Sequence, residues 1–283
     1  MVEIVDERRG TFNRKFALRL EDGAQVEAVV YRGDSLCISS QVGCAVGCPF
    51  CASGANGFGR NLSVDELQAQ VDLVRTVAPG VERVTVSGIG EPLHNHANVA
   101  AFVRQSHAAG LPVSLTSSGG PLSRLAEWFE LPHNGLTLSI HAGTEAVRAK
   151  TVPRGPALDP LFATLEDLLP AASQRRKRRL ALAYLLLPGL NDDDAEIDAF
   201  IERVAPLGIL VHLYAYNPVP TSSQERASDQ RFQAVHAKMR DAGLELRRSS
   251  QARIEATGGC GTLVAVRTDR RARGSALVEP SAQ

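Results

Sequence analysis

The sequence predicts an α/β fold: one large domain in which strands and helices alternate, preceded by a short β-hairpin. From residue 35 onward, six strand-like runs are each followed by a helical pattern, and repeated strand–helix units build parallel sheets with helices outside. Before them, apolar and polar residues alternate from Phe16 to Tyr31 around Asp22-Gly23, a hairpin signal. Strand counting alone leaves open whether the parallel sheet is an open sheet or a partial barrel.

The predicted elements follow one another in strict order. Strands are expected at residues 35–40, 83–87, 113–117, 136–140, 180–187 and 209–216, and helices at 64–77, 97–109, 122–129, 158–169, 193–204 and 228–242. Ser63 with Glu66 forms a capping box at the first helix, and Gly243 is a stop signal for the last. This order divides the chain into a hairpin extension at 1–33, a core domain at 34–266 and a basic tail at 267–283 that we expect to be disordered.

Composition sets limits on the class of protein. The 283 residues suffice for a substantial core, and the hydrophobic share of 44% with a charged share of 22% is ordinary for a soluble globular protein. Because the net charge is zero, any contact with nucleic acid must come from local patches. The N-terminus is too charged for a signal peptide, and the longest apolar run, 180–187, is too short to cross a bilayer. With five cysteines, an odd number, reducing cytoplasmic surroundings are expected.

Three cysteines stand at a C-x3-C-x2-C spacing in one loop that contains Gly and Pro: Cys44, Cys48 and Cys51. Three thiolates in one loop can bind three irons of a 4Fe-4S cube and leave the fourth iron open to chemistry. With Cys37, seven residues upstream, four sulfurs could instead form a zinc site or two disulfides. Zinc modules usually carry two separated C-x2-C pairs, and only Cys48-Pro-Phe-Cys51 has that form, so the spacing favours the cluster.

Polar and glycine residues follow the predicted strands from the second onward. Because strands of such a fold end at one edge, where active sites gather, this pattern predicts a cofactor cleft there, although loops are polar in any case. Gly88-Ile-Gly90 is not a dinucleotide fingerprint, since Leu93 stands where the third glycine belongs. The stretches concerned are residues 88–92, 117–119, 139–141, 188–192 and 216–218.

The cysteine spacing and its context resemble the radical S-adenosylmethionine (radical SAM) superfamily. More narrowly, Cys-Ile-Ser-Ser-Gln-Val-Gly-Cys at 37–44 with Gly-Phe-Gly-Arg-Asn-Leu at 57–62 resembles the RlmN/Cfr family of RNA adenine methyltransferases, over residues 11–263. The resemblance implies a partial (βα)6 barrel of the TIM type, a 4Fe-4S cluster on the three cysteines, and SAM, whose reduction releases a 5′-deoxyadenosyl radical. It also implies an RNA substrate (rRNA or tRNA), an electron donor such as flavodoxin or ferredoxin, a monomer and no membrane contact.

Matching the family motifs one at a time assigns a SAM site. The second strand ends in a stretch that, in the family, supports the amino group of SAM, and the later strand ends match a SAM-contacting serine, a Ser-Leu-His stretch and an Asn-Pro turn. Each group is suited to bonding ribose, adenine or carboxylate. The cofactor-binding residues implied in this way are Gly90, Glu91, Ser118, Ser139, Ile140, His141 and Asn217.

Cys260 lies between glycines in Thr257-Gly-Gly-Cys-Gly261. A structural cysteine prefers a packed place, whereas a cysteine that moves between two partners needs a pliable backbone. The resemblance implies that Cys260 accepts a methyl group from one SAM, that the radical from a second SAM removes a hydrogen from it, and that the methylene radical adds to an adenine ring carbon. Cys37 matches the resolving cysteine, which forms a transient disulfide with Cys260, and Glu27 matches the proposed proton acceptor.

Carbon 2 of adenine lies between two ring nitrogens, so it is too electron-poor to attack a SAM methyl group, whereas a carbon radical can add to it. Arg60-Asn61 and Glu91-Pro92 favour carbon 2 over carbon 8. We expect the family's usual N-terminal helical accessory domain to be absent, because the resemblance begins almost at the first residue, and this leaves a small molecule or peptide as an alternative substrate. Carbon-8 methylation is an alternative reaction. Basic runs at 175–179, 247–248 and 267–273 are candidate phosphate contacts, but the first precedes a strand and belongs to the rim opposite the active edge.

Overall fold

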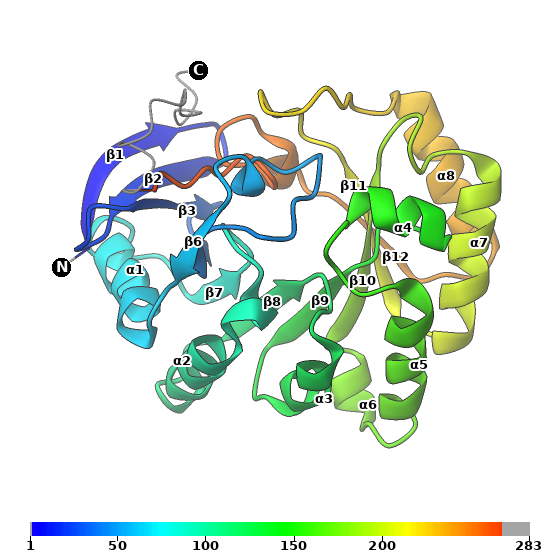
Figure 1. Cartoon of the computed structure of the whole chain (residues 1–283), viewed down its shortest axis with the longest axis horizontal. Helices are drawn as coiled ribbons and strands as arrows, with labels where there is room; N and C mark the ends of the chain where they lie inside the picture. The colour runs from blue at the N-terminus through cyan, green and yellow to red at the C-terminus, as the bar shows by residue number, and fades with distance from the viewer. Residues whose placement is uncertain (1, 268–283) are drawn as a thin grey trace.

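The computed structural model describes residues 2–267, in which ten strands form one sheet and two more form a small second sheet. The strands of the large sheet are, in spatial order, β1 (Glu3–Arg9), β2 (Asn13–Arg19), β3 (Gln25–Tyr31), β4 (Ser35–Ile38), β7 (Arg83–Val86), β8 (Val113–Ser117), β9 (Gly135–Ser139), β10 (Leu180–Leu186), β11 (Leu210–Ala215) and β12 (Leu246–Arg248). The small sheet pairs β5 (Gln41–Gly43) with β6 (Phe58–Asn61). Figure 1 shows the large sheet running across the molecule from β1 to β12.

In the large sheet, each pair of neighbouring strands along the run β4, β7, β8, β9, β10, β11 and β12 is parallel. All six strands that the sequence predicts are present, in the order in which they occur along the chain. Since β1 and β12 stand at opposite ends of the strand order, the curved sheet does not close on itself. The structure therefore confirms the partial (βα)6 barrel and adds β12, a short parallel strand that the sequence pattern did not indicate.

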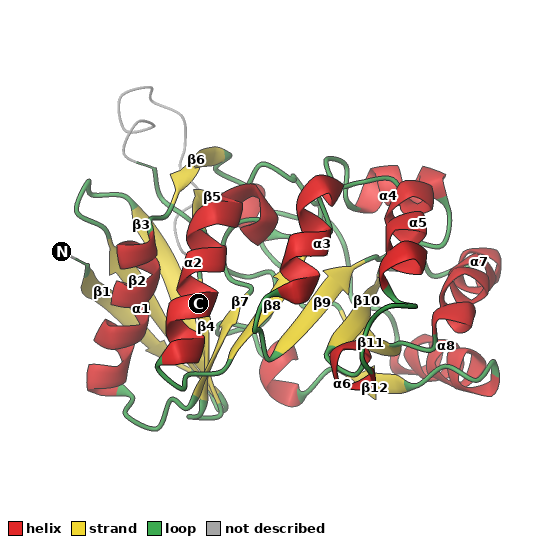
Figure 2. Cartoon of the chain, turned by 90° about the horizontal axis from the view of Figure 1, so that it is seen from below, coloured by secondary structure: helices red, strands yellow, loops and turns green. Residues whose placement is uncertain are grey.

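Helices cover the outer face of the barrel (Figure 2). The six predicted helices are present with ends shifted by no more than one residue, and two short ones, α4 and α6, were not predicted. Ser63 and Glu66 form the predicted capping box, each side chain bonding the other's backbone. The helices are α1 (Val64–Val77), α2 (His96–Ala108), α3 (Leu122–Glu130), α4 (Glu145–Thr151), α5 (Leu158–Leu168), α6 (Gln174–Lys177), α7 (Asp194–Val204) and α8 (Asp229–Asp241).

The N-terminal extension continues the barrel sheet. The predicted hairpin is present as β2 and β3, with Gly23 at φ 81° in its turn, and β3 then pairs antiparallel with β4. An additional strand, β1, flanks β2. This strand was not predicted because its residues are mostly charged. An edge strand exposes much of its length to water and therefore needs no alternating hydrophobic pattern. The extension therefore places β3 beside the first barrel strand.

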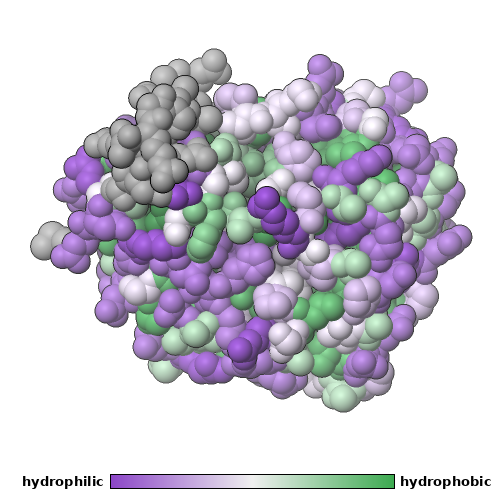
Figure 3. Space-filling model, in the orientation of Figure 1, coloured by the Kyte–Doolittle hydropathy of each residue, from purple (hydrophilic) through white to green (hydrophobic). Residues whose placement is uncertain are grey.

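The surface of the protein has no large hydrophobic area on the described part of the face that Figure 3 shows. The face in Figure 3 is mostly hydrophilic, and its hydrophobic residues lie in separate small groups. Among the described residues, no helix is long and apolar enough to cross a membrane. The predicted disordered tail, apart from Arg267, lies outside the described residues.

Candidate active site

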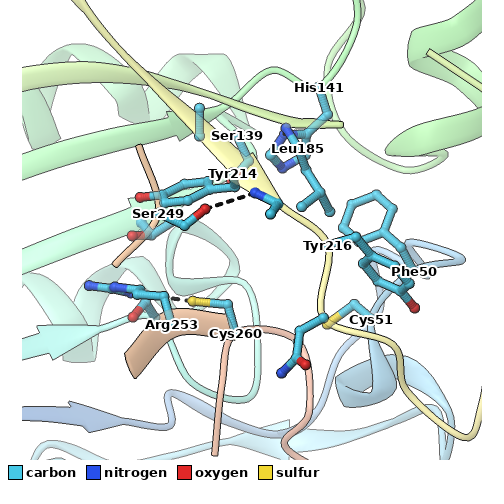
Figure 4. A pocket seen from close by; sticks show the side chains of 16 residues that line it. Phe50, Cys51, Ser139, His141, Leu185, Tyr214, Tyr216, Ser249, Arg253 and Cys260 are labelled. Carbon is cyan, nitrogen blue, oxygen red and sulfur yellow. Dashed lines mark hydrogen bonds between the residues drawn. The ribbon is translucent and has the colours of Figure 1, made fainter. Parts of the chain in front are cut away.

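A cleft lies where the barrel strands end, between the loop that carries the three cysteines and the segment that follows β12 (Figure 4). It encloses about 760 Å³ of open space, part of which is continuous with solvent, and this size suits a small-molecule ligand. Several residues implied by the sequence line it, namely Cys51, Ser139, His141, Asn217 and Cys260, together with Phe50, Tyr214, Tyr216 and Arg253.

The cysteine loop is closed by close backbone packing between its two ends. Gly43 has a φ of 80°, and a Cβ there would lie 1.8 Å from the carbonyl oxygen of Gly57. Within the loop, the backbone N–H of Cys51 donates to the carbonyl oxygen of Cys48 at 3.2 Å. A side chain at residue 43 would force the two ends apart, so glycine is needed here for both its φ and its small size.

The three loop cysteines form a half-buried set of soft donors. Desolvation raises the pKa of Cys44 to about 12 and raises the pKa values of Cys48 and Cys51, and the charges of neighbouring thiolates add to this for Cys44 and Cys48. Partly desolvated thiolates that repel one another are stabilised by a cationic metal centre. The donor set therefore fits a 4Fe-4S cluster, in which each thiolate binds its own iron.

The zinc alternative fits less well. Among the described residues, no three His, Cys, Asp or Glu side chains are arranged to hold a single metal ion. Cys37 does not belong to the cysteine loop, because it is buried on β4 and its thiol lies 3.3 Å from Ser87 Oγ. All five cysteines of the chain are free thiols in the structure, so neither the two-disulfide alternative nor the disulfide between Cys37 and Cys260 that the resemblance implies as a transient state is present.

Glu91 connects the ends of two strands. Its buried carboxylate accepts hydrogen bonds from Ser117 Oγ at 2.5 Å, the Ser118 N–H at 2.7 Å and the Leu93 N–H at 2.9 Å. Neighbouring Gly90 has a φ of 113°, and a Cβ there would lie 2.7 Å from Ser40 Oγ. These two residues therefore hold the loop after β7 in place behind the cleft, and neither is among the cleft-lining residues.

A buried arginine that the sequence did not single out organises the next strand ends. Arg148, on α4, donates hydrogen bonds to four backbone carbonyl oxygens, including those of Ser118 at 2.8 Å, Ser139 at 2.6 Å and Ile140 at 2.7 Å. The hydroxyl of Ser118 is buried without a hydrogen-bond partner in the described part of the chain. Because buried polar atoms are normally paired, this hydroxyl suits a bound cofactor.

His141 is held in an uncommon conformation at the end of β9. Its φ is 57°, and its Nδ1 accepts a hydrogen bond from the Leu185 N–H at 3.0 Å. Burial lowers the pKa of His141 to about 3, so the ring is neutral and its proton is on Nε2. Phe50 of the cysteine loop meets this ring edge to face, with 5.4 Å between ring centroids. Phe50 was missed at the sequence level, although its place inside the cysteine motif was a signal that it lies near a cofactor.

Cys260 lies beside the cysteine loop, as the predicted chemistry requires. The N–H of Ala52 donates to the carbonyl oxygen of Gly261 at 2.8 Å, which ties the two segments together. The side chain of Cys260 lines the cleft and accepts a hydrogen bond from Arg253 Nη1 at 3.4 Å (Figure 4). Burial raises the pKa of Cys37 to about 11, and the charge of Cys260 adds to that shift.

Glu27 lies outside the cleft. Its buried carboxylate pairs with Lys15 Nζ at 3.1 Å and accepts a hydrogen bond from the Val264 N–H at 2.8 Å. Burial raises the pKa of Glu27 in spite of the opposing charge of Lys15. The carboxylate therefore anchors the segment that follows Cys260, and the structure does not bring it together with the cleft-lining residues.

Known proteins are similar to this chain in sequence and in fold. The sequence profile of the radical SAM superfamily matches residues 38–201. A "Probable RNA methyltransferase" of Chromobacterium violaceum is 34% identical over 93% of this chain and 73% of its own length, and a "Dual-specificity RNA methyltransferase RlmN" of Halorhodospira halophila is 31% identical over 94% and 77%. The crystal structure of a radical SAM methyltransferase from Sphaerobacter thermophilus superposes with a TM-score of 0.81 at 29% identity, covering 93% of this chain and 81% of that one.

Proposed function

Because the chain belongs to the radical SAM superfamily and, within it, to the RlmN/Cfr family of RNA methyltransferases, we propose that it methylates an adenine ring carbon of rRNA or tRNA, with carbon 2 favoured. The observation that carries this proposal is the placement of the Cys260 thiol in the same cleft as Cys51. A methyl-carrying cysteine must reach both the cofactor and the base, and a cleft-lining thiol on a glycine-flanked segment can do so.

Cys44, Cys48 and Cys51 are the proposed cluster ligands, and a one-electron donor such as flavodoxin or ferredoxin is the proposed reductant. When bound, the cluster and SAM supply a 5′-deoxyadenosyl radical. Ser118 Oγ, His141 Nε2 and Asn217 are the groups proposed to bond SAM. Ser118 Oγ lacks a hydrogen-bond partner among the described residues, His141 offers an N–H, and Asn217 lines the cleft. Arg148 and Glu91 keep this rim rigid through their backbone bonds.

In the proposed reaction, Cys260 carries the transferred carbon and Cys37 releases the product. The Cys260 thiolate takes a methyl group from one SAM molecule, which leaves as S-adenosylhomocysteine, and the S-methyl group would then give a hydrogen atom to the 5′-deoxyadenosyl radical. Its carbon bonds to the adenine ring, which links RNA and enzyme through a thioether. The adduct then loses one electron to the oxidised form of the electron donor and the ring-carbon proton to solvent. The Cys37 thiolate attacks the Cys260 sulfur, so that a disulfide forms and the bond between sulfur and the CH2 carbon breaks, and the released carbon takes up one proton to become the methyl group of the base. Two electrons from an external reductant restore both thiols.

The position of Glu27 suggests a structural part in this reaction. Its carboxylate bonds the backbone of Val264, four residues beyond Cys260. We therefore propose that Glu27 positions the methyl-carrying segment. For Glu27 to accept a proton from the base, as the family resemblance implies, the segment that it anchors must first move.

The test uses enzyme reconstituted anaerobically with iron and sulfide, and a Cys260→Ala variant. The variant should retain its iron and still convert SAM to 5′-deoxyadenosine, but should transfer no methyl group to RNA. Cys37→Ala serves as the matched variant and should accumulate RNA covalently attached to protein. Mass mapping of methyladenosine in rRNA and tRNA identifies the base position. Methylation retained in Cys260→Ala would contradict the mechanism, and a product on a peptide or metabolite alone would contradict the RNA substrate.

A further inference from the structure

A second cavity lies inside the barrel at the end opposite to the cleft. It is lined by residues at or near the first positions of the barrel strands, such as Ser35 of β4, Gly135 of β9 and Leu180 of β10, whereas the cleft lies at the last positions. It encloses about 940 Å³ of open space, part of it continuous with solvent. The proposed methyl transfer makes no use of this end of the barrel.

The lining of this cavity is strongly basic. No carboxylate is among the described residues that line it, although the chain as a whole has no net charge. A hollow lined by one sign of charge focuses the electric field and attracts counter-ions. The positive groups are the five guanidinium groups of Arg83, Arg178, Arg179, Arg247 and Arg253.

Two of these guanidinium groups are available for a ligand. Arg83 is paired with Asp34, Arg179 donates to the carbonyl oxygen of His133 and Arg253 donates to Cys260. The side chains of Arg178 and Arg247, in contrast, have no hydrogen-bond or ion-pair partner among the described residues. They come from different segments, the loop before β10 and strand β12, so the fold brings together two unpaired cations.

A histidine inside the barrel adds an unsatisfied donor. His212 Nδ1 lies 2.9 Å from the hydroxyl of Tyr214, and His212 Nε2 is buried without a partner in the described part of the chain. Burial, together with the charges of Arg247 and Arg253, lowers the pKa of His212 to about 4, so the ring is neutral. In the tautomer in which the Tyr214 hydroxyl donates to Nδ1, Nε2 carries a hydrogen for which the described residues supply no acceptor. Buried groups of this kind normally have a partner.

We propose that this cavity binds the phosphate groups of a small molecule, such as inorganic pyrophosphate or the phosphate chain of a nucleotide. Guanidinium forks match phosphate oxygens in a bidentate manner, and an imidazole N–H together with the threonine hydroxyls of the lining supplies further donors. The position inside the barrel favours a small ligand over an RNA chain. The site goes beyond the proposed methyl transfer, although Thr116, Tyr214 and Arg253 line both cavities.

The test is isothermal titration calorimetry on the full chain at low ionic strength, with pyrophosphate, ATP and, as a charge control, sulfate. Arg178→Ala and Arg247→Ala remove the two unpaired cations, and both side chains are exposed enough that the fold should survive. Arg124→Ala is the matched control, since it removes the same charge from an exposed position on α3 outside the cavity. Each cavity variant should bind pyrophosphate about tenfold or more weakly, because a charge-assisted bond is lost, and the control should bind as the wild type does.

The outcomes separate the possible ligands. Pyrophosphate and ATP binding with the same dependence on Arg178 and Arg247 supports the proposal, and tighter binding of ATP assigns the site to a nucleotide. Equal affinity in all three variants, or sulfate binding as tight as pyrophosphate, overturns it. An RNA oligonucleotide that loses affinity in both cavity variants, while pyrophosphate does not bind, would assign the surface to RNA and also overturn the proposal. None of these readouts depends on methyl transfer, so the outcome is independent of the proposed function.

Discussion

The guanidinium group of Arg253 lies between the Cys260 thiol and an aromatic ring: Nη1 donates to Cys260 Sγ at 3.4 Å, and Cζ stands 5.1 Å from the centroid of the Tyr31 ring. The Tyr31 hydroxyl in turn donates to the carbonyl oxygen of Gly258 at 3.0 Å. Strand β3 and the segment around Cys260 are therefore joined through one cation and one ring. We infer that Arg253 is a positioning residue for Cys260.

Arg253→Met should lower the rate of RNA methylation about tenfold or more, because it removes a charge-assisted hydrogen bond and a cation–π contact. Arg253→Lys should restore part of the rate, since it keeps the charge but not the planar fork. The measurement is the methylation rate, together with the S-methyl content of residue 260 by peptide mass spectrometry. A wild-type S-methyl content and rate in Arg253→Met would contradict the positioning role.

Cys37 should react slowly with alkylating agents at neutral pH. Burial raises the pKa of this thiol to about 11, so at pH 7 only about one thiol in ten thousand is ionised, and the ionised share grows about tenfold with each pH unit. In a Cys260→Ala background, the rate of iodoacetamide labelling at residue 37 should therefore still be rising at strongly alkaline pH. Labelling of the unfolded chain is the control and should level off near the ordinary thiol pKa. A plateau at that same pH in the folded protein would be evidence against the raised pKa.

Gly43→Ala should destroy the cluster site. A Cβ at residue 43 meets the Gly57 carbonyl oxygen at 1.8 Å, so the loop that holds the cysteines has to open. Gly110→Ala is the matched control, because Gly110 has a similar φ of 74° but nothing within 4 Å of a Cβ. Both variants carry a backbone cost of about 1–2 kcal/mol, but only Gly43→Ala should lose iron and acid-labile sulfide after reconstitution. Equal iron content in the two variants would show that the close packing at residue 43 does not support the site.

Lys15→Met should destabilise the fold in a pH-dependent way. It leaves the buried Glu27 carboxylate without its cation, and breaking a buried pair costs about 3–5 kcal/mol. Burial raises the pKa of Glu27, and without Lys15 the carboxyl takes up a proton as the pH falls. A raised native pKa gives stability that is present at low pH and is lost as the pH rises. The loss should thus be larger at mildly alkaline than at mildly acidic pH.

Unfolding in guanidinium chloride, at a mildly acidic and a mildly alkaline pH, measures the free energy of unfolding of Lys15→Met and of the wild type. Lys150→Met, at an exposed lysine on α4, is the control and should cost little at either pH. A loss in Lys15→Met that is the same at both pH values would mean that Glu27 does not take up the proton.

Local patterns in the sequence predicted the regular elements well. The six barrel strands and six of the helices follow from hydrophobic periodicity, since an element with one buried face shows it in its own residues. The polar edge strand β1 and the very short β12 were missed for the same reason, because neither has a buried face long enough to produce a pattern.

The sequence did not predict the roles of side chains that contact residues far away along the chain. Nothing in the sequence distinguishes Arg148 and Arg253 from other basic residues. Only the fold brings Arg148 to the backbone at the strand ends and Arg253 to the Cys260 thiol. Glu27 shows the opposite case, since resemblance implied a catalytic place and the structure pairs it with Lys15 outside the cleft.

By itself, the sequence determined the alternation of strands and helices and the three-cysteine loop, because both depend on residues that are close neighbours along the chain. Only the tertiary structure decided that Cys260 lies beside that loop, that Cys37 is buried on β4 beside Ser87 and that five arginines line the cavity at the opposite end of the barrel. These placements depend on how the strands pair across the sheet and on where the final segment folds back, and no local pattern encodes either.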